Sequence, residues 1–262
     1  PSPSLRSQPV PPAARGVGHA RAVVCHLLML TLLLLWAAPP PANADTKIWD
    51  GSLNTLWSVG DNWSGNVSPV DGDEVVFPAA ASNKNNTNDK LNLRLRSLRF
   101  TDGGYSLGGN SVTITNGVRA EQASGGSTIN FDIYLGGSQT FECINAGVTL
   151  AVNGFIELGS STLTVANNGD VTFAGQISGA GGVVKHGSGT LTYLGNTDNY
   201  YYGPTDLRGG LLVLGKTDLA ESLANSRLTI SNATVRLSAW HQIGGLPITI
   251  NKSGMLDLSG FN

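Results

Sequence analysis

Apolar and polar residues alternate over short stretches along most of the chain that follows residue 110. Each stretch runs apolar–Thr–apolar and then reaches asparagine, usually with glycine. The phrases are VTITNG from Val112, VTLAVNG from Val148, LTVANNG from Leu163, LTYLGN from Leu191, LTISNA from Leu228 and ITINKSG from Ile248. Alternation with a period of two predicts half-buried strands whose threonines face outward. Asparagine and glycine tolerate the left-handed backbone conformation that a sharp corner requires.

Several of these phrases lie beside a second short stretch of the same kind. These stretches are FIELG from Phe155, VTFAG from Val171, TVRLS from Thr234 and MLDLSG from Met255. Strand-rich segments therefore recur roughly every 18 to 21 residues, which is the length of one coil in a repeat architecture. The sequence between them shows no 3.6-residue periodicity long enough for a helix of three turns. We expect an all-β protein.

Two architectures fit short strands at this spacing. An antiparallel β-sandwich needs turn signals about every 8 to 12 residues. A parallel β-solenoid needs coils of two or three strands, each stacked on the one before. One- and two-residue corners, asparagine at those corners and like residues recurring in each coil favour the solenoid, and the sandwich remains the alternative. In a solenoid the asparagine of LTISNA, Asn232, is a corner between two faces of one coil.

The first 44 residues have the pattern of a secretory signal peptide. Basic residues precede the apolar run Val23–Ala38, and Ala42-Asn43-Ala44 forms a small-x-small cleavage site before Asp45. A membrane anchor is the alternative, but this run of about 16 residues is short for a bilayer span of about 20. We expect cleavage at about Ala44–Asp45, an extracellular or outer-surface location, and no membrane span in the mature chain.

Composition narrows the class of protein further. The chain has 34 glycines and only 13% charged residues, which is typical neither of disordered chains nor of helical enzymes. Removing a leader that holds three of the 16 basic residues leaves 13 basic against 18 acidic residues, a net charge of −5. An acidic chain is not expected to bind nucleic acid. Cys25 lies in the leader and Cys143 then has no partner, so packing must stabilise the fold without disulfides.

One segment resembles a known family. Residues 181–216, GGVVKHGSGTLTYLGNTDNYYYGPTDLRGGLLVLGK, are similar to the autotransporter-associated β-strand repeat of bacterial surface proteins. The matching positions are Gly181, Gly182, Val183, Val184, Lys185, Gly187, Gly189, Thr190, Leu191, Asn196, Tyr202, Gly203, Thr205, Gly210 and Leu212. The resemblance implies a right-handed parallel β-helix displayed at, or released from, the outer surface of a Gram-negative-type cell.

The resemblance also suggests how the chain is divided. The region from Asp45 places Trp49, Trp57 and Trp63 before a turn and a strand, as at the start of such proteins. A solenoid exposes apolar interior at its first coil and needs a cap, so we expect these tryptophans in a capping β region over 45–108. Residues 109–262 are the expected β-helical repeat region. Because the sequence ends in mid-phrase, we expect this region to be truncated at its C-terminal end.

Candidate chemistry is sparse. Glycosidases need two carboxyl groups across one sugar bond, and acids on one face of adjacent coils would supply them; the candidates are Asp132, Glu157, Asp170 and Asp206. A carbohydrate-active β-helix enzyme, either a polysaccharide lyase or a hydrolase, is therefore one alternative function. These acids are scattered, however, and lack clustered basic neighbours, so solvated outward positions are the favoured interpretation and no residue is predicted to be catalytic.

Metal and nucleophile sites have weaker signals. His186 and His241 are 55 positions apart, and the HGSGT string around Ser188 lacks the helix of a nucleophile elbow. Asp71, Asp73 and Glu74 in PVDGDEVVF have the spacing of some calcium loops, but the remaining ligand positions do not follow. A turn that enters a strand is the favoured interpretation, and we expect neither a metal site nor a cofactor.

Surface aromatic residues are the remaining candidates. Tyr200 and Tyr201 exceed the single tyrosine of the repeat pattern, so we predict that they form a contact surface. Together these features predict a secreted or surface-displayed, non-enzymatic structural or adhesive protein. The expected partners are surface glycans or proteins of other cells or matrix. A glycan-binding module is the second alternative function.

Overall fold

The structure is a computed structural model that describes residues 44–223 and 227–261. The expected signal peptide, residues 1–44, lies outside the described residues except for Ala44. Within the described part of the chain, no helix is long and apolar enough to cross a membrane. Almost all regular structure there is β-strand, and a single 3₁₀ turn occupies Gly60–Asn62.

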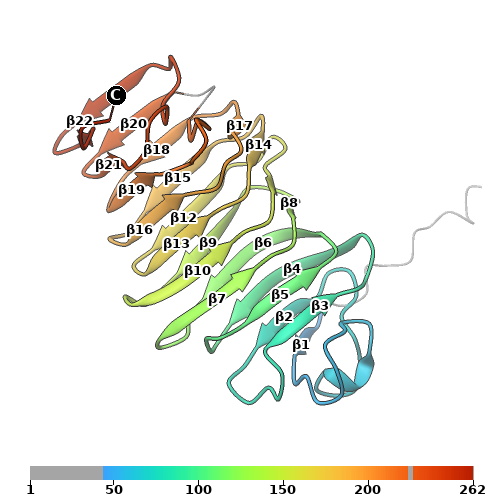
Figure 1. Ribbon diagram of the computed structural model, residues 1–262. Helices are drawn as coiled ribbons and strands as arrows, with labels where there is room; N and C mark the ends of the chain where they lie inside the picture. The colour runs from blue at the N-terminus through green and yellow to red at the C-terminus, as the bar shows by residue number, and fades with distance from the viewer. Residues whose placement is uncertain (1–43, 224–226, 262) are drawn as a thin grey trace, which may run out of the picture. The chain divides into compact units, whose positions relative to one another are not determined.

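The strands form two sheets (Figure 1). The nine-stranded sheet contains, in spatial order, β3 (Asn85–Asn88), β5 (Ser106–Gly109), β7 (Gly125–Ile129), β10 (Val148–Val152), β13 (Asp170–Phe173), β16 (Thr190–Tyr193), β19 (Leu211–Leu214), β21 (Thr234–Leu237) and β23 (Met255–Asp257). The fourteen-stranded sheet contains β1 (Thr46–Ile48), β2 (Glu74–Phe77), β4 (Leu93–Phe100), β6 (Val112–Ala120), β8 (Ile133–Leu135), β9 (Gln139–Cys143), β11 (Ile156–Glu157), β12 (Leu163–Asn167), β14 (Ile177–Gly179), β15 (Val183–His186), β17 (Tyr200–Tyr201), β18 (Thr205–Leu207), β20 (Leu228–Ser231) and β22 (Ile248–Asn251).

Every pairing between these strands is parallel. Strands of successive coils lie side by side, as Figure 1 shows for β10, β13 and β16. The parallel β-solenoid is therefore confirmed, and the antiparallel sandwich is wrong. The nine strands of the smaller sheet correspond to about nine turns. Parallel ladders already join β1, β2 and β4, so the coil stack continues without a break across residue 108.

The larger sheet divides in two at β6. The first half of β6, Val112–Ile114, pairs with β8, whereas its second half, from Gly117 to Ala120, pairs with β9. The coils from β8 to β19 therefore carry three strands instead of two, and the last two coils, β20–β21 and β22–β23, again carry two. We call the ladder β8–β11–β14–β17 the first arm and the ladder β9–β12–β15–β18–β20–β22 the second arm. Along the second arm, paired residues are 20 apart at Leu163 and Val183 and 24 apart at Gln139 and Leu163, so the coils are somewhat longer than the sequence spacing indicated.

The alternation of inward- and outward-facing residues along each strand produces the hydrophobic core of the solenoid. In β12 the residues Leu163, Val165 and Asn167 are buried and the residues between them are half-buried. Corner asparagines join neighbouring coils, as when Asn153 Nδ2 donates to Asn130 Oδ1 at 2.9 Å. Asn232 lies between β20 and β21 with a φ of 52°, which is the left-handed corner expected for LTISNA.

The three N-terminal tryptophans are completely buried, as expected for core packing. The ring of Trp63 lies edge-on to Trp49 and to Trp57, with centroid distances of 5.0 and 5.9 Å. Each indole N–H has an acceptor; that of Trp57 donates to Asn86 Oδ1 at 2.7 Å. Trp57 also packs against Phe131, 5.8 Å away between centroids, so the tryptophan cluster is continuous with the solenoid core.

Candidate functional site

The four candidate acids do not come together. Glu157 lies on the first arm, Asp170 on the nine-stranded sheet and Asp206 on the second arm, while Asp132 directly precedes β8. The rung neighbours of Glu157 are Tyr134 and Ser178. No two of these four acids occupy paired positions in a ladder, although Asp132 and Glu157 lie on adjacent rungs of the first arm, two positions apart in register.

Three of these acids accept local hydrogen bonds, and Asp206 Oδ2 lies 3.9 Å from Arg208 Nη2. Asp132 accepts from the Phe155 N–H at 2.8 Å, and Asp170 accepts from the Thr190 N–H at 3.1 Å. Glu157 accepts from the Gly159 N–H at 2.9 Å and from the Ser178 hydroxyl. Such bonds join adjacent coils or fix a strand end, which is a structural role.

Among the described residues, neither histidine makes a hydrogen bond to Ser188, as a nucleophilic serine would require. His186 ends β15 and is half-buried, whereas His241 is exposed and has a φ of 58°. Ser188 Oγ donates to Asn168 Oδ1 at 3.3 Å, so the hydroxyl contacts an amide of the preceding coil. Among the described residues no group of three or more His, Cys, Asp or Glu side chains is placed to hold a metal ion. Burial raises the pKa of the Cys143 thiol to about 11, which favours the unreactive protonated form.

The PVDGDEVVF segment forms a turn that enters β2, as the favoured interpretation predicted. Gly72 provides a φ of 93° at this turn. The buried Asp73 carboxylate accepts from the backbone N–H groups of Asp45 and Val70, both at 2.9 Å. Its oxygens are thus used to hold the chain's first strand, β1, next to the turn.

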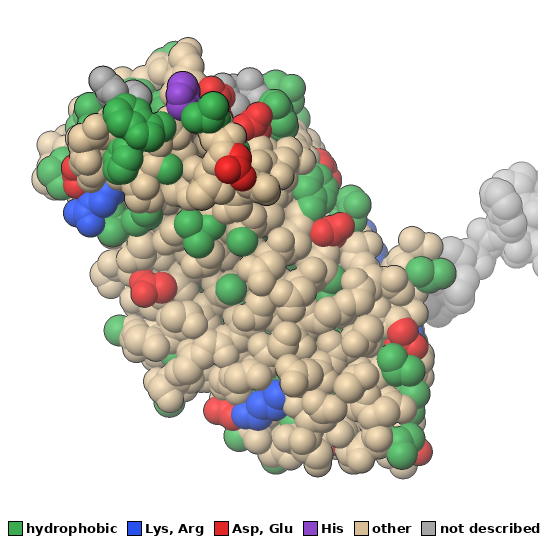
Figure 2. Space-filling model, viewed as in Figure 1, with side chains coloured by type: hydrophobic (Ala, Val, Ile, Leu, Met, Phe, Trp, Pro, Cys, Tyr) green, Lys and Arg blue, Asp and Glu red, His purple; other side chains and the backbone are tan. Residues whose placement is uncertain are grey.

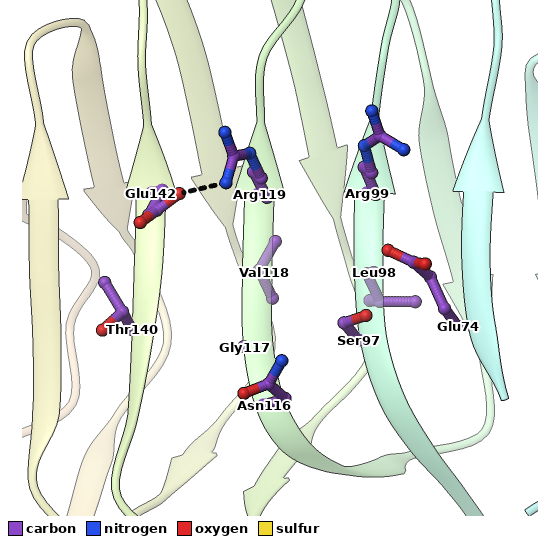
Figure 3. A pocket seen from close by; sticks show the side chains of 10 residues that line it. All are labelled: Glu74, Ser97, Leu98, Arg99, Asn116, Gly117, Val118, Arg119, Thr140 and Glu142. Atoms are coloured by element: carbon purple, nitrogen blue, oxygen red, sulfur yellow. Dashed lines mark ion pairs between the residues drawn. The ribbon is translucent and has the colours of Figure 1, made fainter. Parts of the chain in front are cut away.

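A groove lies on the outer face of β2, β4, β6 and β9 (Figure 3). Its volume is about 350 Å³. The lining residues are Glu74, Ser97, Leu98, Arg99, Asn116, Gly117, Val118, Arg119, Thr140 and Glu142. We call it the Arg–Glu groove. Figure 3 shows Glu142 turned toward Arg119 across the gap between β9 and β6.

Strand register explains the position of the groove. Ser97, Gly117 and Thr140 are paired across β4, β6 and β9, so small side chains form one row of the floor. Gly117 has a φ of 116°, and a Cβ there would lie 2.0 Å from the Thr140 carbonyl oxygen. The close backbone approach at the point where β6 divides therefore requires glycine and leaves the surface hollow.

Charged side chains form the next outward row. Arg119 Nη1 lies 3.2 Å from Glu142 Oε2, and Arg119 Nε donates to Glu121 Oε2 at 2.9 Å. Arg99 Nε donates to Glu121 Oε1 at 2.7 Å. Burial raises the pKa of Glu121, but hydrogen bonds and charge from Arg99 and Arg119 more than offset this, so the pKa is lowered overall. These arginines already form ion pairs with carboxylates. The charged groups of the groove therefore connect neighbouring coils and are not available as an anion-binding site.

Sequence reasoning did not identify this groove. A signal was present, because Arg and Glu recur at outward positions of LRLRSLRF, VRAEQ and TFECI. Only the register shows that these positions are adjacent.

Tyr200 and Tyr201, which were predicted to form a contact surface, are consecutive residues of β17, and their side chains lie on opposite faces of this strand. Tyr200 is 46% exposed, but Tyr201 is only 2% exposed, and its hydroxyl lies 2.7 Å from Thr205 Oγ1. The expectation that Tyr201 belongs to a contact surface is therefore wrong. Successive strand residues point to opposite faces, so the exposed neighbours of the buried Tyr201 are Tyr200 and Tyr202.

The outer surface carries few charges. Figure 2 shows uncharged polar side chains and backbone over most of the visible face, with charged side chains scattered among them. Hydrophobic side chains gather at the end formed by the last strands, where Ile248 and Ile250 of β22 are exposed. These two residues pair with the buried Leu228 and Ile230, so they continue an interior column of the solenoid.

No family model, no curated protein and no solved structure matches this chain. The fold and the geometry of its surfaces therefore carry the functional argument.

Proposed function

We propose that the protein is an exported structural and adhesive solenoid, secreted or displayed on the cell surface, and that it is not an enzyme. The observation that carries the proposal is the unbroken nine-stranded parallel ladder from β3 to β23. Parallel strands bonded along one axis make each coil a support for the next, which suits a stalk or a presenting surface. The signal-peptide pattern and the repeat resemblance in residues 181–216 support export and display.

The chemistry of the surface supports a non-catalytic role. Asp170 and Asp206 lie on ladders different from that of Glu157, and Asp132, Glu157 and Asp170 accept hydrogen bonds from nearby backbone groups. In the Arg–Glu groove, Arg119 contacts two carboxylates at 2.9 and 3.2 Å, and Arg99 contacts one of the same two residues. These charges are occupied in holding coils together.

Export is tested by expressing the chain with its own leader in a Gram-negative host and sequencing the N-terminus of the product. We expect mature protein outside the cytoplasm that begins at or near Asp45. Its susceptibility to protease added to intact cells, or its recovery from the medium, distinguishes display from release. Unprocessed protein confined to the cytoplasm would contradict the proposal.

The enzyme alternative is tested on a panel of neutral and acidic polysaccharides. We expect neither reducing ends nor unsaturated products above the level of the Glu157→Gln and Asp170→Asn variants. Product release by the natural chain that disappears in either variant would establish a carbohydrate-active enzyme instead.

A further inference from the structure

The first arm carries a row of outward-facing residues that is set by strand register. Thr113 of β6 pairs with Tyr134 of β8, Tyr134 with Glu157 of β11, Glu157 with Ser178 of β14, and Ser178 with Tyr200 of β17. We call Thr113, Tyr134, Glu157, Ser178 and Tyr200 the tyrosine row. These residues are far apart in sequence but occupy five consecutive rungs of one face.

Both tyrosines of the row present their rings to solvent. Tyr134 is 41% exposed and Tyr200 is 46% exposed. Three rungs separate them, which is roughly 14 Å at a strand spacing of about 4.8 Å. Phe155 lies edge-on to Tyr134 with centroids 6.2 Å apart, and the Tyr200 hydroxyl donates to Asp198 Oδ2 at 2.9 Å. These contacts support the rings in place, so little side-chain freedom remains to be lost when a ligand binds.

Polar groups fill the interval between the two rings. The Ser178 hydroxyl donates to the Glu157 carboxylate, which also accepts from the Gly159 N–H at 2.9 Å. A carboxylate has about four acceptor positions, so Glu157 retains acceptor capacity for ligand hydroxyl groups. The row thus alternates an aromatic face, an acceptor, a hydroxyl and a second aromatic face.

A hollow extends the row at its N-terminal end. It has a volume of about 300 Å³ and is lined by Asn92, Leu93, Ser111, Val112, Thr113 and Tyr134. Tyr134 is a wall of this hollow and also a member of the row. A ligand that follows the row can therefore continue into a small polar depression.

The charges around the row select against anions. Asp132 precedes Tyr134, Glu157 lies within the row, and Asp198 contacts Tyr200. Glu221 lies beside Asp198, since its N–H donates to Asp198 Oδ1 at 2.7 Å. Arg94 pairs with Thr113, so this cation lies at the opposite end of the row. Carboxylate-bearing or sulfated ligands would meet like charge along most of the row.

We propose that the tyrosine row is a binding site for an extended, neutral oligosaccharide. Tyr134 and Tyr200 would stack on the apolar faces of two sugar rings, and Glu157 and Ser178 would hydrogen-bond the hydroxyl groups between them. The separation of about 14 Å between the two tyrosines, set by the strand spacing, lets one extended chain of several sugar rings contact both. The inference rests on the proposed adhesive function and names the chemistry of the adhesive surface.

A proline-rich peptide is the other ligand that stacks on exposed tyrosines. It fits the row less well, because proline has no N–H to donate and the Glu157 carboxylate would remain unmatched. Sugar hydroxyls supply those donors.

The test is isothermal titration of the full chain with neutral hexasaccharides of glucose, mannose and xylose, with a galacturonate hexamer, and with a polyproline peptide. We expect at least one neutral hexasaccharide to bind and the galacturonate hexamer and the peptide not to bind. Tyr134→Ala and Tyr200→Ala should each weaken binding about tenfold, and Tyr200→Phe should remain within about threefold because the ring is retained. Trp240→Ala is the matched control, since Trp240 is an exposed aromatic residue outside the row, and should bind like the natural chain.

Circular dichroism of each variant shows whether the solenoid is intact. Failure of every neutral hexasaccharide to bind, binding by either Tyr→Ala variant as tight as that of the natural chain, or preference for polyproline would overturn the inference. The proposed function is tested separately. If the exported chain adheres to cells but does not bind these sugars, the inference about the tyrosine row is wrong and the adhesive function stands. Retention in the cytoplasm would remove the adhesive function whatever the titration shows.

Discussion

Lys185 lies in register with Val165 on the rung before it, in the same inward-facing column of the second arm. The lysine is only 1% exposed, and Leu207 follows it in the column. Its ammonium group reaches the edge of the core, where Nζ donates to the carbonyl oxygens of His186 and Gly187, both at 3.3 Å. Burial lowers the pKa of Lys185 to about 8, although the charge of Asp170 acts in the opposite direction. A cation therefore occupies an apolar column with long hydrogen bonds, and no carboxylate among residues 44–223 and 227–261 bonds to it directly.

Replacing Lys185 with methionine should stabilise the protein. Met has a similar length and no charge to desolvate, and buried charges replaced by apolar residues commonly gain stability. We expect the free energy of unfolding at neutral pH to increase by about 1 kcal/mol, measured by urea denaturation. Lys252→Met, at an exposed position, is the control and should change stability little. A loss of stability in Lys185→Met would mean that the two carbonyl contacts outweigh desolvation.

Stability should rise with pH and then fall. Burial lowers the pKa values of Lys185 and Lys216 from 10.5 to about 8, so the unfolded chain binds more protons than the folded chain between these values and stability increases with pH there. Burial raises the pKa of Cys143 from 9.0 to about 11 and that of Tyr201 from 10.0 to about 12, so stability is lost as pH rises beyond 9 and 10. The sum predicts a maximum near pH 10, roughly 2 kcal/mol above the value at pH 7.

Urea denaturation at intervals from about pH 7 to pH 11 measures this curve. Lys185→Met should remove well over half of the net rise between pH 8 and pH 10, because one of the two lysines is then absent while the opposing losses from Cys143 and Tyr201 remain. A flat or falling curve between pH 8 and pH 9 would show that the folded lysines titrate near their ordinary values.

Substituting Gly117 with alanine should destabilise the protein at the point on β6 where the larger sheet divides. The new Cβ would lie 2.0 Å from the Thr140 carbonyl oxygen, and the φ of 116° is unfavourable for any residue with a side chain. We expect a loss of at least about 2 kcal/mol. Gly137→Ala is the matched control, since a Cβ there meets no atom within 4 Å. Equal stability of the two variants would mean that β6 and β9 separate at little cost.

The corner at Asn232 should discriminate between side chains. Asn232 has a φ of 52°, and its Oδ1 accepts from the Ser253 hydroxyl of the next coil at 3.2 Å. Asn232→Gly should change the unfolding free energy by only a few tenths of a kcal/mol, whereas Asn232→Val should cost about 1–2 kcal/mol because β-branched residues disfavour the left-handed region. Thermal unfolding of the two variants measures the difference in stability. A valine variant as stable as the glycine variant would show that residue 232 does not need a left-handed backbone conformation.

Several features follow from local sequence and were predictable. The strands over Val112–Ala120 and Leu163–Asn167 were visible as apolar–Thr–apolar alternation, and the corner at Asn232 as the break in LTISNA. The parallel stacking followed from the recurrence of such phrases. Tryptophan burial followed from the need to close the first coil.

The sequence could not assign faces where polarity was ambiguous. Three consecutive tyrosines, Tyr200–Tyr202, give no indication of which ring is buried, and a shift of one residue exchanges the faces. The structure buries Tyr201, which pairs with Gly179, and leaves Tyr200, which pairs with Ser178, on the exposed face. Lys185 is a second case, because the alternation that buries Val165 also buries a charged residue in the same register.

By itself, the sequence determined that this chain forms short strands with asparagine corners, because alternation and corner chemistry are properties of adjacent residues, and it favoured parallel stacking over an antiparallel sandwich. Only the tertiary structure decided which residues of different coils meet. Coils of 20 to 24 residues contain corners of unequal length, so spacing along the chain does not give the register. The Arg–Glu groove and the tyrosine row both arise from that register, since each is made of residues that are adjacent across strands and distant along the chain.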